Sequence, residues 1–504
     1  MAAILDTRSR VSCSKPPGVV MGKRVLGVGV VLGLLLVMVA CAPSFESGAT
    51  LRATARGPLV DLAWDAATDP DGQAIDRYRI EVNGAQVGFI DAPATTCVMR
   101  GLAPSTTYEL AVTAYDSAGE WSGDTDNGRL TKTYTRSSAG GAGSTRSCVP
   151  STDSDGDRLP NAVETNTGTY VSAGNTGSNP AVADTDGDKI GDGDESLGTI
   201  GGLNLPAMNT KPVHKDLLFE FDWFNDNAEP GVCGSHSHRP TAGAISRLTT
   251  AFANAPVANP DGTTGVRVVA DYGQGGVFTG GNLVPDSDGV IAGGVGDAQF
   301  TAIKGANFAA NRNGYLHYAL MPHRYGTSSS SSGQAEIFGD DLIVSLYCFG
   351  SDGNVANTIV HEVGHNLGLF HGGNISGPNY KPNYNSVMNY EFQFPGVDTN
   401  CVPGGDGLLT YSTGTRASLN ESALSETLGL CGGVDVDWNT NGSINAGSVA
   451  ADINPFPGGD GSLNVLTDFN DWANLNFNGL TDNDGAALEP EVVTEQPVPP
   501  SARR

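Results

Sequence analysis

Three histidines and a glutamate stand within one short segment of this sequence, at spacings that suit a metal ion. The segment reads His-Glu-Val-Gly-His-Asn-Leu-Gly-Leu-Phe-His from His361 to His371. Residues four apart share one face of a helix, so His361 and His365 can direct their imidazoles at one point. Glu362 can reach a water on that metal, and Gly368 permits the turn that returns His371 as third ligand. Three protein ligands leave one position of a zinc ion open, which predicts a catalytic zinc site and hydrolytic chemistry.

A second motif, Ser-Val-Met-Asn-Tyr over residues 386–390, follows the last histidine at the distance expected of a methionine turn. The two segments together resemble the zinc helix and Met-turn of the metzincin clan of zinc endopeptidases, over roughly residues 212–480. The resemblance implies an α+β catalytic domain with a twisted mixed sheet. It also implies that Met388 forms an apolar floor under the zinc and that Tyr390 contacts the metal or the oxyanion. Tyr390 as a mere core aromatic is the alternative, and pappalysin-like and serralysin-like branches both fit.

The resemblance also implies a mechanism and a substrate. Glu362 would act as general base and pass the proton to the leaving amine. A protein or peptide substrate would pair with the antiparallel edge strand just before the zinc helix, within roughly residues 333–347. The alternative function is a calcium-dependent cell-surface adhesion or binding protein with a vestigial protease core, and an intact Glu362 argues against it. A zinc hydrolase acting on a peptide-like bond outside protein is a third possibility.

Alternation of apolar residues predicts the elements that must position this site. Asp216–Trp223 reads as a buried strand, and residues 240–254 read as a helix with Thr241 as its cap. Further strands are expected at residues 266–270, 315–321 and 341–346.

Residues 152–196 contain two acidic repeats that resemble the calcium-binding thrombospondin type 3 repeats. Each places carboxylates at alternate positions around a glycine, which suits a hard cation; a solvated acidic linker is the alternative. The predicted calcium ligands are Asp153, Asp155, Asp157, Glu164, Asp184, Asp186 and Asp188. A tentative third calcium loop contains Asp437, Asn439 and Asn441, although Ser448 stands where an EF-hand has glutamate.

Residues 55–135 are expected to form an all-β sandwich. Alternating apolar residues at 59–64 and 78–82 are separated by turn signals, and residues 102–116 resemble the late strands of a fibronectin type III domain, with Tyr108 as its buried tyrosine. This domain is read as a spacer or binding module. Residues 136–151 are rich in Ser, Gly and Ala and predict a flexible linker.

The chain of 504 residues is strongly acidic, with 55 Asp and Glu against 28 Lys and Arg and a net charge of −27. Its length suggests several domains, and its charge argues against nucleic acid as a partner. The Pro- and Glu-rich residues 487–504 are expected to be disordered.

The N-terminal residues 1–41 read as an export signal. Lys23 and Arg24 precede an apolar run that ends in Val-Met-Val-Ala-Cys, which resembles a bacterial lipoprotein box with Cys41 as the lipidated residue. A conventionally cleaved signal is the alternative. Residues 42–54 would then be a tether, and the exported protein would be lipid-anchored at the outer membrane or cell surface, otherwise secreted.

Six further cysteines in an exported chain suggest disulfides: Cys97, Cys148, Cys233, Cys348, Cys401 and Cys431. Cys401 and Cys431 are the preferred pair because both follow the methionine turn. Cys233 is faintly similar to an inhibitory propeptide cysteine, but a structural role is favoured. His236 and His238 suit either a second metal site or a structural or surface role.

Overall fold

A computed structural model describes most of the chain from Ala42 to Thr494. The described residues are 42–56, 59–99, 102, 107–117, 121–124, 127–136, 148, 153–161, 163–226, 235–285, 289–326, 331–348, 350–454, 461–480 and 491–494. The predicted export signal and Cys41 therefore lie outside them. In the described part of the chain no helix is long and apolar enough to cross a membrane. Two compact units are present: one reaches to Glu164 and includes residues 197–203, and the other comprises residues 165–196 and those from Asn204 onward.

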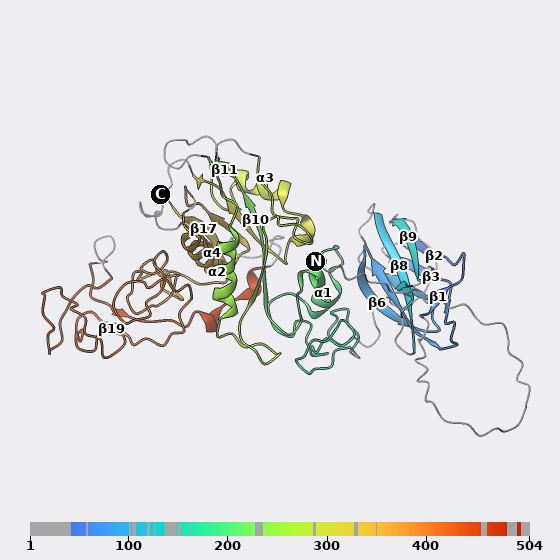
Figure 1. The fold of residues 1–504 in the computed structure, drawn as a ribbon, viewed down its shortest axis with the longest axis horizontal. Coiled ribbons are helices and arrows are strands. Elements are labelled where there is room, and N and C mark those ends of the chain that lie inside the picture. The colour runs from blue at the N-terminus through green and yellow to red at the C-terminus, as the bar shows by residue number, and fades with distance from the viewer. Residues whose placement is uncertain are drawn as a thin grey trace, which may run out of the picture. The chain divides into compact units, whose positions relative to one another are not determined.

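The first unit contains an all-β sandwich of a three-stranded sheet, β2-β3-β7, and a four-stranded sheet, β6-β5-β8-β9 (Figure 1). Its strands are β1 (Ser44–Phe45), β2 (Leu51–Arg56), β3 (Leu59–Trp64), β4 (Ala67–Thr68), β5 (Ile75–Val82), β6 (Ala85–Asp91), β7 (Thr96–Met99), β8 (Thr107–Asp116) and β9 (Arg129–Thr135). Apolar residues alternate along these strands and meet between the sheets, where Trp64 and Tyr78 pack edge to face at 5.4 Å. The predicted sandwich is confirmed.

Three details of this unit differ from the prediction. The expected tether of residues 42–54 belongs to the sandwich, because Phe45 and Leu51 are buried in its core. Cys148, placed in the predicted linker of residues 136–151, is disulfide-bonded to Cys97 and buried against the same core. Tyr108 is only half-buried, and Tyr78 is the tyrosine that fills the core.

The second unit is built on a six-stranded mixed sheet of order β13-β10-β15-β18-β17-β21. Four strands are mutually parallel and adjacent in the order β13, β10, β15 and β18. The strand β17 is antiparallel to both of its neighbours, β18 and β21. The sheet strands are β10 (Asp216–Trp223), β13 (Arg267–Asp271), β15 (His317–Met321), β17 (Gly333–Ile337), β18 (Asp341–Val344) and β21 (Glu491–Thr494).

Two helices, α2 (Ala242–Ala253) and α4 (Asp352–Asn366), pack on each other and on this sheet (Figure 1). Thr241 caps α2 as predicted, since its hydroxyl accepts the Ala244 N–H at 3.0 Å. The apolar side of each helix joins the β10 side chains in one core, which holds Phe219, Phe221, Leu248, Phe252 and Ile359. The parallel strands are buried on both faces, which explains their nearly continuous apolar sequences.

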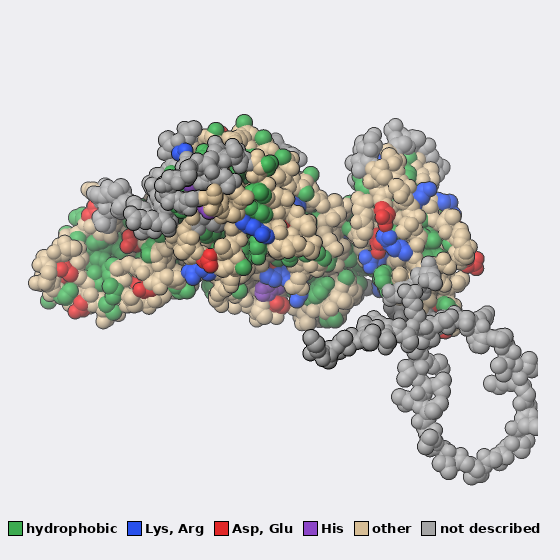
Figure 2. All heavy atoms as spheres, turned by 45° about the horizontal axis from the view of Figure 1, so that its top comes forward, with side chains coloured by type: hydrophobic (Ala, Val, Ile, Leu, Met, Phe, Trp, Pro, Cys, Tyr) green, Lys and Arg blue, Asp and Glu red, His purple; other side chains and the backbone are tan. Residues whose placement is uncertain are grey.

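Short elements complete the second unit. They are α1 (Asp192–Leu197), α3 (Ala298–Asn307), β11 (Asn225–Asp226), β12 (His236–Ser237), β14 (Val290–Ile291), β16 (Arg324–Tyr325), β19 (Leu419–Asn420) and β20 (Val465–Leu466). The 3₁₀ turns of the chain are Ser122–Asp124, Leu205–Met208, Ala310–Arg312, Trp472–Asn474 and Phe477–Gly479. Charged side chains visible in Figure 2 are dispersed among uncharged ones, in keeping with a charged content of 16%.

The edge of the sheet differs from the prediction in two respects. The antiparallel strand was expected to come directly before the zinc helix. In the structure that strand is β17, and β18, which is parallel to β15, follows β17 in the chain and comes directly before α4. The expected disordered tail contains β21, which pairs with β17 through Ala335 opposite Val493. The expectation of disorder over residues 487–504 is therefore wrong for these four residues.

The segment after residue 397 has little regular structure and a small core of its own. Leu419, Leu424, Leu430, Trp438 and Leu466 form that core. The predicted disulfide between Cys401 and Cys431 is confirmed. Cys348 is also disulfide-bonded, and Cys233 lies outside the described residues.

Candidate metal centre

Helix α4 carries the first two histidines of the predicted zinc motif. Ser351 caps the helix by accepting the Asn354 N–H at 3.3 Å, and every residue from Val355 to Asn366 is buried. One helical turn separates His361 from His365, and their rings lie 5.0 Å apart with both side chains inaccessible to solvent. A buried pair of imidazoles on one helix face is a strong arrangement for a metal ion.

The chain leaves α4 through Gly368, whose φ is +89°. The Gly368 N–H donates to His365 O and the Leu369 N–H donates to Gly364 O, both at 2.8 Å, which closes the helix end. A side chain at Gly368 would also collide with the ring of Phe338. This left-handed turn, predicted from the sequence, reverses the chain so that His371 comes back to the helix.

The structure brings the three histidines together. One ligand nitrogen from each of His361, His365 and His371 lies within 4.8 Å of the others, and His365 Nε2 is 3.2 Å from His371 Nε2. The Nδ1 atoms of His361 and His365 lie 2.7 Å from Val387 O and Leu369 O, respectively. A carbonyl oxygen only accepts, so each Nδ1 carries the hydrogen and each Nε2 keeps its lone pair for a metal.

These carbonyl partners could not be read from the sequence. The acceptor on Leu369 depends on the turn at Gly368, and the acceptor on Val387 depends on how the methionine turn docks under α4. The Val387 N–H in turn donates to Thr410 O at 3.1 Å, which holds this turn in place.

Met388 lies directly beneath the helix that carries the histidines. Its side chain is fully buried, and a Cβ added to Gly364 would collide with its sulfur and stand 3.0 Å from its Cε. Gly364 is the residue just before His365, so the thioether packs against the part of α4 that holds the histidines. The predicted position of Met388 as an apolar floor fits this packing.

Tyr390 faces the same histidines from the side. Its ring centroid is 4.3 Å from that of His371 and 5.8 Å from that of His361. Its backbone N–H donates to Asn379 Oδ1 at 3.0 Å, which anchors the residue beside the cluster. Tyr390 thus lies beside the histidine cluster, and its role toward a bound metal or oxyanion stays a prediction.

Glu362 is fully buried and faces the edge of the sheet. A Cβ added to Gly333, the first residue of β17, would overlap Glu362 Oε1 and stand 2.6 Å from its Cδ. The carboxylate thus lies against the backbone of the antiparallel strand. Glu362 therefore lies between the histidine cluster and β17, the strand that is paired with β18 on one side and with β21 on the other.

Asn366 connects the end of α4 to β17 and β18 by side-chain hydrogen bonds. Its Nδ2 donates to Glu336 O at 2.9 Å and to Asp341 O at 3.1 Å, and its Oδ1 accepts from His317 Nδ1 at 3.2 Å. Burial lowers the pKa of His317 to about 4, so its ring is neutral at pH 7. These hydrogen bonds fix the position of the C-terminal end of α4 relative to β17.

The first acidic repeat forms a tight loop in the first unit. One carboxylate oxygen from each of Asp153, Asp155 and Asp157 lies within 4.8 Å of the others. Asp153 accepts the Gly156 N–H at 2.6 Å and the Arg158 N–H at 2.9 Å, with Gly156 at φ +84°. Glu164 of the same repeat is buried. The loop offers an oxygen cluster of the kind that a hard cation binds.

The second acidic repeat has the same design in the second unit. Asp184 accepts the Gly187 N–H at 2.7 Å and the Lys189 N–H at 3.0 Å, while Asp184, Asp186 and Asp188 converge within 4.8 Å. The repeated hydrogen-bond pattern follows from the repeated sequence.

Two further carboxylates join this second cluster. Glu195 and Asp216 are buried beside Asp188, and Asp216 N–H donates to Asp188 Oδ2 at 2.5 Å. Both Glu195 oxygens are buried, and the carboxyl group of Glu195 lies against that of Asp216. Burial, and then the charge of Asp188, raise the pKa of Glu195 well above its usual range. Asp216 forms an ion pair with Arg267 at 2.5 Å. The carboxyl groups of the cluster outnumber this one guanidinium.

Sequence reasoning did not assign Asp216 to this site. Its position at the start of an apolar strand marked it as structural, and only the fold brings it to the repeat. Glu195 was visible in the sequence as an acidic residue after the repeat, but its role depends on α1, which begins at Asp192.

The tentative third calcium loop is closed by its own backbone. Asp437 accepts the Asn441 N–H at 3.1 Å and the Gly442 N–H at 2.7 Å, and Asn439 Oδ1 accepts the Asn441 N–H at 3.1 Å. Glu426 accepts from Asn445 at 2.7 Å. These bonds close the loop, and calcium at this loop stays a prediction.

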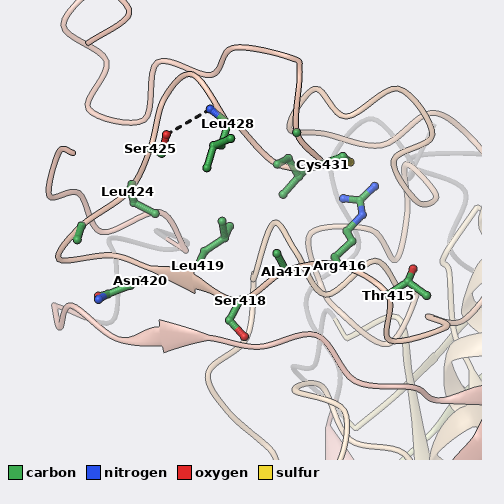
Figure 3. Close-up of a pocket in the computed structure, with 14 residues that line it drawn as sticks. Thr415, Arg416, Ala417, Ser418, Leu419, Asn420, Leu424, Ser425, Leu428 and Cys431 are labelled. Atoms are coloured by element: carbon green, nitrogen blue, oxygen red, sulfur yellow. Dashed lines mark hydrogen bonds between the residues drawn. The ribbon is translucent and has the colours of Figure 1, made fainter. Parts of the chain in front are cut away.

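A pocket of about 640 Å³ lies in the C-terminal segment, among residues 415–432 (Figure 3). Leu419, Leu424 and Leu428 direct their side chains toward it, and Ser425 Oγ accepts the Leu428 N–H at 3.3 Å. The residues that line it do not include those of the histidine cluster.

Comparison with known proteins identifies one module. The family model for the fibronectin type III domain matches residues 47–126, which fall within the sandwich. An α-amylase of Niallia circulans is 41% identical over 76 residues, which is 15% of this chain and 6% of that enzyme. The chain thus spans a small fraction of this relative's length.

Solved structures give weak similarities. The Clostridium perfringens spore cortex lytic enzyme SleM is 19% identical, covering 19% of this chain and 28% of that one, with a TM-score of 0.16. Fibronectin(III)-like modules of Clostridium thermocellum CbhA are 18% identical, covering 19% and 49%, also at 0.16. The chain is multidomain, with a fibronectin type III domain near its N-terminus and a mixed α/β sheet later.

Proposed function

We propose that this chain is a zinc-dependent endopeptidase of metzincin type. The observation that carries the proposal is the convergence of three buried histidines beside a buried glutamate that faces an antiparallel strand. The Nδ1 hydrogen bonds of His361 and His365 to carbonyls suit neutral imidazole ligands for zinc. Zinc, when bound, would acidify a water and polarise the scissile carbonyl.

The remaining chemistry belongs to the residues of this chain. Glu362 accepts the proton of the attacking water and delivers it to the leaving amine. Tyr390, beside His371, is positioned to donate a hydrogen bond to the developing oxyanion, a contribution of about 3 kcal/mol for a well-placed donor. The substrate backbone would lie along β17, where strand addition aligns it with Glu362.

Gly333 keeps the space that Glu362 needs, so a Gly333→Ala variant is expected to lose activity. The added Cβ would meet Glu362 and stand 2.7 Å from Ile343 O, which forces the carboxylate or the strand to move. A displacement of about 1 Å costs roughly 100-fold in rate, so we expect kcat/KM to fall about 10- to 100-fold with zinc content unchanged. Gly305→Ala on α3, where nothing lies within 4 Å, is the matched control. Equal loss in both variants would contradict this role for Gly333.

The strand β21 bears directly on substrate binding, because it occupies the free edge of β17. A peptide that adds to β17 must displace it, and an attached segment competes at high effective concentration. Removal of residues 481–504 is therefore expected to raise kcat/KM several-fold, mainly through a lower KM. Removal of residues 495–504 alone, which spares β21, is the control. Unchanged KM after the longer deletion would show that substrate does not use this edge.

Calcium is proposed for the two acidic repeats, with Glu195 and Asp216 added to the second site. The buried Glu195 oxygens and the excess of carboxylates over guanidinium support a cation there. The chain is further proposed to be exported, through the signal at residues 1–41, and lipid-anchored at Cys41. The fibronectin type III domain would act as a spacer or binding module.

The test of the proposed function is digestion of an unfolded protein by the purified chain in calcium, with and without a zinc chelator. Cleavage that stops with 1,10-phenanthroline and returns when zinc is added back supports a zinc peptidase. Zinc binding without any cleavage would favour the binding-protein alternative, for which the fibronectin type III domain is the supporting observation.

A further inference from the structure

A second group of three histidines lies apart from α4, at the carboxyl ends of two sheet strands. β10 and β15 are parallel neighbours, with Trp223 opposite Met321. His323 follows the end of β15, and His236 and His238 lie on and just after β12. The Phe224 N–H donates to Met321 O at 3.2 Å and the His238 N–H donates to Phe224 O at 2.9 Å, so backbone bonds connect the two segments.

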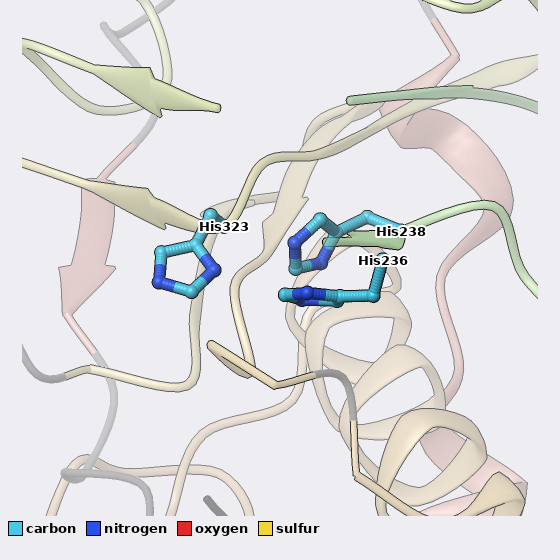
Figure 4. A group of neighbouring side chains, drawn as sticks. All are labelled: His236, His238 and His323. Atoms are coloured by element: carbon cyan, nitrogen blue, oxygen red, sulfur yellow. The ribbon is translucent and has the colours of Figure 1, made fainter. Parts of the chain in front are cut away.

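The three imidazoles face one another (Figure 4). One nitrogen from each lies within 4.8 Å of the other two, and the ring centroids are 4.6, 5.5 and 5.6 Å apart. His236 and His238 are two residues apart in an extended segment, which turns both side chains to the same side. Small side-chain rotations would bring three nitrogens to the ~2.1 Å distance of zinc ligands.

The surroundings suit neutral imidazoles that bind a cation. His238 and His323 are 0% and 2% exposed, so the three rings meet in a largely buried place, where neutral imidazoles offer lone pairs to a metal. His236 Nε2 lies 2.8 Å from Tyr347 O and therefore donates to it, which fixes the orientation of this ring and places its hydrogen on Nε2.

We propose that His236, His238 and His323 bind a second divalent transition-metal ion, with zinc the best fit to three imidazoles. The ion would link β12 to the segment after β15 across the carboxyl edge of the sheet. Tyr347 supports the site from a third segment, because its N–H donates to His323 O at 3.1 Å and its carbonyl accepts from His236. Because the ligands come from different segments, the site forms only in the folded chain and its metal stabilises the fold.

The test is the zinc content of the full chain after dialysis against metal-free buffer that contains calcium. We expect about two zinc ions per wild-type chain. About one ion should remain in His238→Gln and about one in His361→Gln/His365→Gln, with none in the combined variant. His214→Gln, whose side chain pairs with Asp261 at 3.0 Å, is the matched control and should keep two.

The variants separate this site from the proposed active site. One ion in the wild type that is lost completely in His361→Gln/His365→Gln would overturn the second site. Because His238→Gln could unfold the segment, cobalt is used as a second probe on the folded His361→Gln/His365→Gln chain. A visible d–d spectrum of a tetrahedral cobalt site there supports the proposal, and a featureless spectrum overturns it. Activity is not needed for either readout, so failure of the peptidase proposal would leave the result interpretable.

Discussion

A Glu362→Gln variant is expected to lose kcat/KM for an unfolded protein substrate by about 10³- to 10⁴-fold. The amide has nearly the same shape but cannot accept the proton of the attacking water, and general-base catalysis contributes on the order of 10²- to 10⁴-fold. Glu362 is fully buried against Gly333, so bulk water cannot easily replace its carboxylate. The loss should fall on kcat, with KM little changed, because the side chain acts in the transition state.

Zinc content and thermal unfolding must be measured on the same variant. None of the three histidines is altered, so the glutamine variant should keep its zinc and its fold. Glu109→Gln, an exposed residue of the sandwich that pairs with Arg129 at 2.9 Å, serves as the matched control and should retain full activity. If the zinc-loaded Glu362→Gln protein turned over substrate at the wild-type rate, the assignment of Glu362 as general base would be contradicted. Retained ligand binding without turnover in either protein would favour the adhesion alternative.

Removal of calcium, with zinc kept saturating, is expected to lower the midpoint of thermal unfolding of the second unit by about 10 °C. A ligand at 1,000 times its dissociation constant stabilises the folded state by about 4 kcal/mol, and each kcal/mol is worth roughly 2–4 °C in a domain of this size. The physical reason is the buried cluster of Asp186, Asp188, Glu195 and Asp216, because burial and mutual repulsion make their ionised form costly and raise the pKa of Asp188 unless a cation compensates the charge.

The cluster also lies at the start of a strand of the six-stranded sheet. Asp216 begins β10, and its N–H is bound to Asp188 of the repeat, so loosening of the repeat should reach the strand that anchors the sheet. Activity should therefore fall together with stability when calcium is removed.

Glu195→Gln provides the specific test of this cluster. Loss of one buried carboxylate should weaken calcium binding, so calcium should raise the midpoint of thermal unfolding by less than in the wild type. In the absence of calcium the midpoint should be higher than that of the wild type, because repulsion within the cluster is relieved. Differential scanning calorimetry of both proteins over a calcium series measures both effects. Asp261→Asn, at a half-buried site that pairs with His214, is the control. If the midpoint of thermal unfolding of the wild type did not change with calcium concentration, the cation site would be contradicted.

Local patterns predicted most of the regular elements. Asp216–Trp223 was expected as a strand and is β10, and Thr241 was expected as a cap and caps α2. Both depend on short-range physics, namely apolar runs in a buried strand and a hydroxyl at the first turn of a helix. The Cys401–Cys431 pair was also found from the sequence, because the two residues share one segment.

The errors lie where distant segments meet. Within the Pro- and Glu-rich residues 487–504, the β-branched run from Val492 to Thr494 is too short to predict a strand by itself, and β21 forms by pairing with β17. Residues 42–54 have the composition of a tether, yet Phe45 and Leu51 fill a core whose other side is supplied by strands further along the chain.

The sequence by itself determined the spacing of His361, Glu362 and His365 on one helix and the turn at Gly368, because helix period and glycine conformation act within a few residues. Only the tertiary structure decided which groups surround them. The carbonyl of Val387, the sulfur of Met388 against Gly364, and Gly333 against Glu362 all depend on the docking of separate segments.

The same division holds for the second histidine group. His236 and His238 were visible as a pair in the sequence, but His323 lies far along the chain and joins them only because β10 and β15 are parallel neighbours in one sheet. Strand order and register are set by the packing of the whole core, and that packing is a property of the folded chain that no local pattern contains.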